Sequence, residues 1–394
     1  MTETSYPNSI ECISFPAARR GRLLAGAPRP VRRPLEEDRA LEETLPLQGT
    51  GPASGVLPLE LAALRRRFAS AHRLRPAIFW ADLAVSAGIG WTAFAVAGFA
   101  SPGSARSLAA LLIATLALYR AVLFIHEIAH LRRGSVPGFE VVWNLLVGLP
   151  LMVPSLMYVG SHREHHDITR YGTELDPEYE PIASWRPLRI AASFLVMPIL
   201  PPLLALRWGV IGPVSRLVPP LRPFVVGHLS TLVINARYRR AMPRRENARR
   251  WALEEAAGAV YFWAGVALLA SGVVAPHWAA HWLIVGTGIL VLNHARTLAA
   301  HRYENEGEPM DWAGQLGDSI NMPGLPVLTA LVAPVGLRYH GLHHMMPGLP
   351  YHSLGAVHRA LESELPEDSA YRETQRGGLL SSLRGLFAAA ARRS

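Results

Sequence analysis

The chain has 394 residues, half of them hydrophobic, and its mean hydropathy of +0.18 indicates a membrane protein rather than a soluble enzyme. Its net charge of +9 comes from arginine alone, and because the arginines flank apolar segments without interleaved aromatic residues, the charge argues against nucleic-acid binding. The single cysteine, Cys12, excludes a disulfide framework, a thiolate metal site and an iron–sulfur cluster, so a metal would need nitrogen or oxygen ligands.

Residues 1–76 are rich in proline, arginine, glutamate and glycine, and they lack both a sustained apolar period and the layout of a secretory signal. We predict a basic, largely disordered cytoplasmic arm. Its last part, 57–74, has leucine and alanine at helical spacing around three consecutive arginines at 65–67. This pattern suits a helix on the membrane surface, and a solvated helix is the alternative.

Four apolar stretches follow in two pairs. The first pair covers 77–100, where Asp82 is the only charged residue, and 108–125; the second covers 256–274 and 282–298. Each stretch approaches the ~20 residues that a helix needs to cross ~30 Å of hydrocarbon. Because the connection within each pair is short, we predict an all-α integral membrane protein with four transmembrane helices in two hairpins.

Arginines are concentrated before the first span and over 216–250, whereas the tips of both hairpins carry few. Arginine excess marks the cytoplasmic side, so we expect both hairpins to begin and end in the cytoplasm, together with both chain ends. Two further apolar stretches, 141–159 and 190–214, are interrupted by prolines. We assign them to the membrane interface or to re-entrant segments, which keeps the histidine clusters on one side; two full crossings are the alternative.

Eight of the sixteen histidines fall into three tight groups: HEIAH at 126–130, HREHH at 162–166 and HGLHH at 340–344. The spacing i and i+4 puts His126 and His130 on one helix face, and the other two groups permit the same arrangement. Imidazole suits iron, zinc, copper and nickel, and so many ligands exceed the capacity of one metal, so two metals are implied. The predicted ligands, with the residue after the fourth span as the ninth, are His126, His130, His162, His165, His166, His301, His340, His343 and His344.

A ligating imidazole usually donates its second N–H to a carboxylate or a carbonyl. Asp176 and Glu127 are candidates for this role, and His294 is a possible additional ligand, a residue behind the ligands or part of a substrate channel. Other acids within sequence reach of the histidine groups are Glu164, Asp167, Glu304 and Asp318. Four tryptophans are candidates either for lining a substrate tunnel or for ordinary packing: Trp80, Trp91, Trp143 and Trp263.

The order HEIAH, then HREHH with DITRYGTELDPE, then HGLHHMMPGLPYHSL resembles the membrane fatty acid desaturase superfamily over roughly 77–365, and the short gap in the first group resembles acyl-lipid desaturases. The resemblance implies four spans and a cytosolic cap that holds two irons, which activate O2 with two electrons and remove hydrogens from an unactivated alkyl chain. It places a desaturase-like domain over 77–365 and a cytoplasmic tail over 366–394. We expect a bacterial inner-membrane protein.

The function that this resemblance implies is the introduction of a double bond into a fatty acyl lipid, and a lipid hydroxylase or ketolase with the same site is the alternative. The sequence contains no HPGG haem segment and only one cysteine, so we expect a separate electron donor such as a ferredoxin or a cytochrome b5. The basic stretch 216–250 could bind an acidic donor, although topology alone also explains its charge.

Two hypotheses from other classes compete. HEIAH also fits the H-E-x-x-H motif of zinc peptidases, in which His126 and His130 would bind zinc and Glu127 would activate water. That hypothesis leaves six or seven clustered histidines without a role. A catalytically silent sensor or scaffold with the same fold is the third hypothesis, but all three histidine groups are intact in the sequence.

Overall fold

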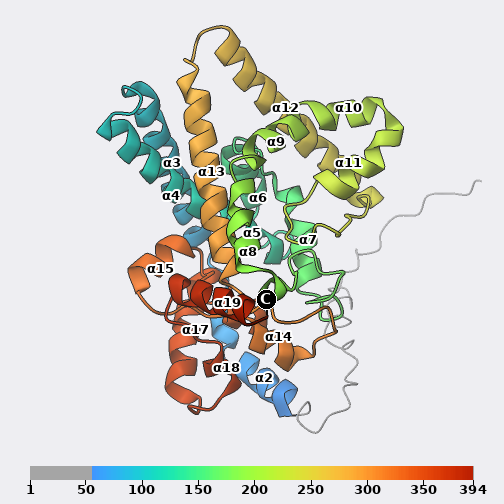
Figure 1. Cartoon of the computed structure of the whole chain (residues 1–394), viewed down its shortest axis with the longest axis vertical. Coiled ribbons are helices and arrows are strands. Elements are labelled where there is room, and N and C mark those ends of the chain that lie inside the picture. Colours follow the sequence, from blue (N-terminus) through green and yellow to red (C-terminus); the bar gives the residue numbers. More distant parts are fainter. Residues whose placement is uncertain (1–55, 394) are drawn as a thin grey trace, which may run out of the picture. The chain divides into compact units, whose positions relative to one another are not determined.

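The computed structural model describes residues 56–393, which form helices and loops with no β-strand (Figure 1). The prediction of an all-helical protein is therefore confirmed for these residues. Most of the predicted N-terminal arm lies outside the described residues. Its end forms α2 (Val56–Arg67), in which Leu61 is buried and Arg67 pairs with Glu364.

The first predicted hairpin corresponds to α3 (Pro76–Phe99) and α4 (Ala105–Val122), which pack along each other. The turn between them ends where the Ser104 side chain accepts a hydrogen bond from the backbone N–H of Ser107, which caps α4. Helix α5 (Phe124–His130) continues α4 with little interruption, so 105–130 forms one apolar helix of 26 residues. The second predicted span thus carries the first histidine group at its end.

Helix α12 (Arg245–Ala270) is the third helix that is long and apolar enough to cross a membrane. The predicted fourth span is present as α13 (His277–Leu298), but it does not qualify with the other three as a membrane span, and its polar residues include His277, His281, Asn293 and His294. A bent pair of segments, 187–196 and 200–217, meets at an angle of 46° and is a further candidate. Among residues 56–393, three helices, or four if the bent pair forms one span, are therefore suited to a membrane.

The segments that prolines interrupt are short helices with irregular turns between them. Helix α6 (Phe139–Trp143) leads into a wider helical turn over Asn144–Gly148, and the Asn144 side chain accepts a hydrogen bond of 2.8 Å from the backbone N–H of Ser155. The bent pair consists of α8 (Pro187–Ser193), α9 (Leu200–Leu206) and α10 (Gly212–Leu217), followed by α11 (Arg222–Leu229).

One buried carboxylate ties this bent pair to α12. Glu255 accepts hydrogen bonds from Arg207 at 2.8 Å and from Arg222 at 2.7 Å, and its side chain is only 2% exposed. Such a buried ion cluster needs its partners in place, because an uncompensated charge in this environment would be costly.

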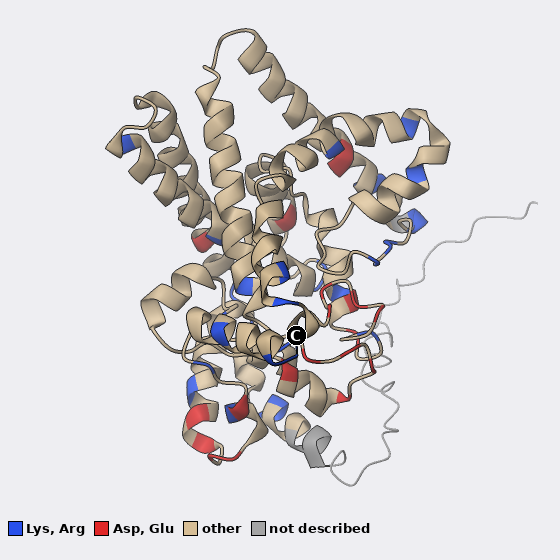
Figure 2. Ribbon diagram, viewed as in Figure 1, with Lys and Arg blue, Asp and Glu red and all other residues tan. Residues whose placement is uncertain are grey.

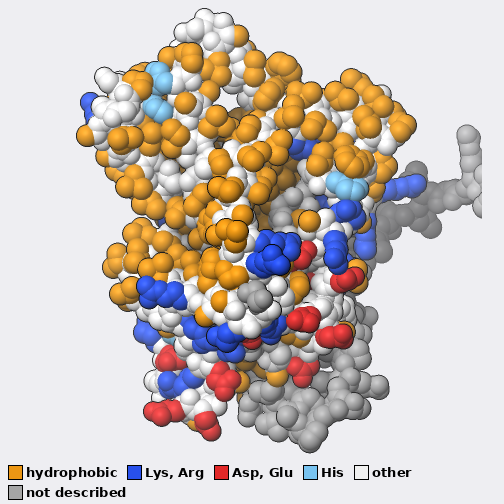
Figure 3. Space-filling view, viewed as in Figure 1, with side chains coloured by type: hydrophobic (Ala, Val, Ile, Leu, Met, Phe, Trp, Pro, Cys, Tyr) orange, Lys and Arg blue, Asp and Glu red, His pale blue; other side chains and the backbone are white. Residues whose placement is uncertain are grey.

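The remaining helices gather at the end of the structure opposite the tips of α3, α12 and α13, and many charged residues lie with them, while others lie on α10, α11 and α12 (Figures 1 and 2). Hydrophobic side chains dominate the surface around the long helices, where Val85, Ile113 and Val260 are exposed (Figure 3). The helices of the charged end are α7 (Val159–His165), α14 (Trp312–Asp318), α15 (Pro326–Val332), α16 (His340–Met345), α17 (Tyr351–Glu364), α18 (Ala370–Glu373) and α19 (Leu379–Arg393).

The segment after 365 packs against the rest of this end. Leu386 and Ala390 of α19 are buried in a small core together with Tyr171, Tyr179 and Tyr303. The last helix therefore contacts the aromatic residues that surround the functional site described below.

The single acid of the first predicted span is paired. Asp82 accepts hydrogen bonds from Arg120 of α4 at 2.8 Å and from the hydroxyl of Tyr351 of α17 at 3.0 Å. We expect Asp82→Asn to lower the free energy of unfolding by about 1–3 kcal/mol, because it weakens charge-assisted hydrogen bonds that join three helices.

Thermal unfolding of the purified protein in detergent would measure this effect. Arg106→Gln is the matched control, because Arg106 is an exposed arginine of the same hairpin for which no ion pair is recorded. Equal midpoints for Asp82→Asn and the wild type would contradict the proposed role of the pair.

Candidate metal centre

Each histidine group lies on or beside a short helix that directs its imidazoles inward. His126 and His130 lie one turn apart on α5, and the HREHH group occupies the end of α7. The HGLHH group occupies α16, where the helical spacing puts His340 beside His344. His301 lies just beyond α13, held by an isolated β-bridge to Ser319.

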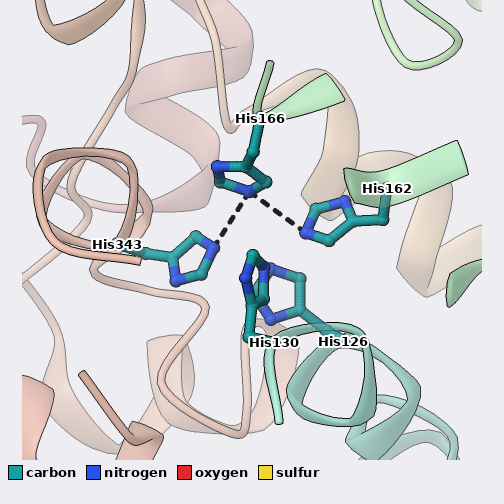
Figure 4. A group of neighbouring side chains, drawn as sticks. All are labelled: His126, His130, His162, His166 and His343. Carbon is teal, nitrogen blue, oxygen red and sulfur yellow. Dashed lines mark hydrogen bonds between the residues drawn. The ribbon is translucent and has the colours of Figure 1, made fainter. Parts of the chain in front are cut away.

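The structure brings all nine predicted ligands into two groups. In the first, one nitrogen from each of five histidines lies within 4.8 Å of the others, and their rings converge on a common point (Figure 4). The second group meets the same distance criterion with four histidines. The first group is His126, His130, His162, His166 and His343, and the second is His165, His301, His340 and His344.

Carboxylates, two of them buried and one half-buried, orient three of these imidazoles. Nδ1 of His162 lies 2.8 Å from Glu178, Nδ1 of His165 lies 2.9 Å from Asp176, and Nδ1 of His301 lies 3.1 Å from Asp318. A carboxylate accepts the Nδ1 proton, so the Nε2 atom of each neutral ring carries a lone pair.

The Nε2 atoms face one another at distances that a metal-free site would not favour. Nε2 of His166 lies 3.2 Å from that of His162 and 3.1 Å from that of His343. Nε2 of His340 lies 2.9 Å from that of His301 and 3.0 Å from that of His344.

A ring nitrogen carries either one proton or one lone pair, so the central Nε2 of each group, in His166 and His340, can make only one of its two contacts as an ordinary hydrogen bond. Burial also lowers the pKa of His340, His343 and His344 well below its usual value, which keeps these rings neutral. Both nitrogens of His126 are buried without a hydrogen-bond partner among the described residues. A cation coordinated by the Nε2 atoms would remove these conflicts, so the nitrogen donors of both groups fit a metal such as iron.

A cavity of about 170 Å³ adjoins the first group. His126 and Tyr158 line it near the histidines, and apolar residues of α9 and α13, including Leu204 and Ile289, form much of its wall. Such a cavity suits part of an alkyl chain.

Comparison with known proteins agrees with this geometry. Residues 102–375 match the fatty acid desaturase family. The chain is 44% identical to a ceramide hydroxylase of Caulobacter vibrioides over 313 residues, which cover 79% of this chain and 88% of that protein. The chain belongs to the fatty acid desaturase family. It is therefore an oxidoreductase, and the peptidase and scaffold hypotheses have no further support.

Several expectations change within this desaturase-family site. His294 belongs to neither histidine group; its Nε2 lies 2.6 Å from the hydroxyl of Ser193, and it lines the cavity. Glu127 accepts a hydrogen bond of 3.1 Å from the backbone N–H of Tyr351 and lies 3.9 Å from His126 Nδ1, too far to orient that ring.

The sequence interpretation missed Glu178 and Tyr171. Glu178 orients His162, and the hydroxyl of Tyr171 lies 2.8 Å from His301 Nδ1. Glu178 stands two residues after Asp176 in the DPE segment, so its proximity to the other acid was an available signal.

The candidate tryptophans pack or bond within the protein and do not line the cavity. Trp143, Trp91 and Trp263 donate their indole N–H to the carbonyls of Ala121, Leu146 and Gly209, and Trp80 stacks edge-on against Phe139.

The two-group arrangement predicts the metal content of variants of this desaturase-family protein. We expect His343→Ala and His344→Ala each to lower bound iron to about half the wild-type content, because each removes a ligand from only one group. Metal analysis of the purified membrane protein would measure this.

His294→Ala is the matched control and should retain the wild-type iron content. Iron loss in His294→Ala, or full iron content in both ligand variants, would contradict the assignment of the two groups.

The carboxylates predict a second effect. We expect Asp318→Asn and Asp176→Asn to weaken iron affinity by about 10–100-fold, because a neutral amide holds the Nδ1 proton less strongly. Competition with a chelator would give the affinities. Asp311→Asn, which alters the exposed N-cap of α14, should leave iron affinity unchanged; an equal change there would show that the loss is not specific to the orienting carboxylates.

Proposed function

We propose that this chain hydroxylates a ceramide or a closely related lipid, using O2 and two iron ions bound by the two histidine groups. The observation that carries the chemistry is the division of nine histidines, six of them buried and three half-buried, into two nitrogen-lined groups. The choice of hydroxylation over desaturation is supported by the 44% identity to a ceramide hydroxylase across most of both chains.

Iron bound in these groups would supply the activation of O2 that an unactivated C–H bond requires. The protein's own contribution is to orient the ligands and to exclude water. Asp176, Glu178 and Asp318 hold imidazole rings in one tautomer, and the burial of both groups keeps bulk water away from the reacting carbon.

We propose that the long helices cross the bacterial inner membrane as two hairpins, α3 with α4–α5 and α12 with α13, and that the charged end is a cytosolic cap. The exposed apolar side chains of α3, α4 and α12 support this arrangement. The polar residues Asn293 and His294 of α13 are compatible with it, because they face the cavity. Both chain ends would then lie in the cytoplasm, with the catalytic domain over 77–365.

We propose that a separate protein, such as a ferredoxin or a cytochrome b5, supplies the electrons. Exposed arginines in and next to the loop that precedes α12 would attract an acidic donor. These arginines are Arg237, Arg239, Arg244, Arg245 and Arg249.

Desaturation of the same lipid is the second candidate, because the family assignment covers it and both reactions begin with removal of hydrogen from the chain. Mass spectrometry of total lipids from a ceramide-producing host would separate the two. We expect the intact chain, expressed with an electron donor, to add one oxygen to ceramide, and an equally expressed His343→Ala variant to add none.

A loss of two hydrogens in place of the oxygen would make the protein a desaturase. Unchanged ceramide despite bound iron and a working electron donor would contradict both candidates.

A further inference from the structure

The cavity beside the first histidine group contains a charged side chain that metal binding does not require. Arg296 lies in the last turn of α13, lines the cavity and is only 6% exposed. Arginine stays charged in proteins, so a guanidinium is held here in a largely apolar environment. Burial of such a charge costs several kcal/mol unless a partner compensates it.

The described residues place no carboxylate within ion-pair distance of Arg296. Its Nη2 donates to the side-chain oxygen of Asn293 at 2.9 Å, its Nε has no partner, and the guanidinium also lies near the hydroxyl of Tyr119. Glu178, the acid that lines the same cavity, is engaged by His162 at 2.8 Å and by the hydroxyl of Tyr158 at 3.3 Å. The hydrogen-bond partners of Arg296 among the described residues are thus neutral, and Glu178 acts on it through its charge without a direct ion pair.

The hydrogen-bonding groups of Arg296 and Asn293 that have no partner among the described residues are donors. A guanidinium only donates hydrogen bonds, and its contact with the Asn293 oxygen leaves the NH2 of that amide free to donate as well. No hydrogen bond from this NH2 to another described residue is recorded. Both residues line an apolar cavity, so their remaining donors suit an acceptor oxygen there, and a carbonyl is the strongest neutral acceptor in an amide-linked lipid.

We propose that Arg296, assisted by Asn293, binds the amide carbonyl oxygen of the lipid substrate and so determines which carbon is oxidised. This inference rests on the proposed function for the identity of the lipid. The cavity of about 170 Å³ is smaller than the 300–1,000 Å³ or so that a whole drug-sized ligand occupies, so it accommodates only part of a long-chain lipid. Arg296 and His126 both line it, so the bound carbonyl and the oxidised carbon belong to the same short part of the molecule.

The test compares Arg296→Met with the wild type, both as full-length iron-loaded protein, on C16 ceramide and on its thioamide analogue. Sulfur is a far weaker acceptor than oxygen, and the analogue keeps the shape and the neutral charge of the lipid. We expect the wild type to oxidise a carbon within a few bonds of the amide. Arg296→Met should raise KM for ceramide by about 10–100-fold, the loss expected for a hydrogen bond to a charged group, and should spread the product over neighbouring carbons.

The thioamide analogue and the conservative variant Arg296→Lys distinguish carbonyl binding by Arg296 from a purely structural role of this residue. The thioamide should bind the wild type weakly, and Arg296→Met should change its KM by much less than it changes that of ceramide. Arg296→Lys should restore part of the preference for ceramide because it keeps a charged donor. Equal losses on both lipids, or an unchanged KM and a single unchanged product in Arg296→Met, would overturn the inference.

Direct binding distinguishes failure of this inference from failure of the proposed function. Dissociation constants of the two lipids would be measured by intrinsic tryptophan fluorescence in the absence of an electron donor. A preference of the wild type for ceramide over the thioamide that disappears in Arg296→Met would support the inference even if no lipid were oxidised. Equal affinities of the wild type for both lipids would overturn it even if ceramide were hydroxylated.

Discussion

The arrangement of this protein depends on the approach of uncharged imidazoles within a buried site. Nε2 atoms of His340 and its two neighbours lie 2.9 Å and 3.0 Å apart, and the first group has the same pattern around His166. Such contacts cannot all be hydrogen bonds, because each nitrogen carries at most one proton. The fold holds these atoms together through the carboxylates behind them and through helices that arrive from distant parts of the chain.

The carboxylates Asp176 and Asp318 are themselves fixed by backbone and tyrosine groups. The N–H of Gly172 and that of Glu178 donate to Asp176, while Tyr171 and Tyr179 donate to Asp318. The aromatic residues of this layer also pack against α19. The end of the chain thus supports the second histidine group through one intermediate layer, which is how precise metal sites are usually stabilised.

The apolar helices and the histidine site meet at the cavity. His126 lies in the last turns of the helix formed by α4 and α5, and α13 contributes Asn293 and Arg296 to the wall of the same cavity. A membrane-derived chain could therefore reach the histidines through apolar surroundings, with a polar anchor close to the reacting carbon. The proposed choice of the oxidised carbon depends on Arg296 and His126 lining the same cavity, and less on the size of the whole substrate.

The sequence alone determined the local features of this protein. Helical spacing placed His126 beside His130, and apolar stretches located the long helices. The three histidine groups in order indicated the family and eight candidate ligands, and the position after the fourth span indicated His301 as the ninth. These features depend on neighbours within a few residues, or on motifs that the family shares, so they can be inferred without the tertiary structure.

Only the tertiary structure decided how the histidines divide. HREHH and HGLHH each contribute to both groups, Glu178 rather than Glu127 orients a ring, and His294 and Arg296 line the cavity. These assignments depend on the directions in which side chains leave helices that are distant in sequence. Spacing along one helix fixes which residues share a face, but the packing of several helices decides what that face meets.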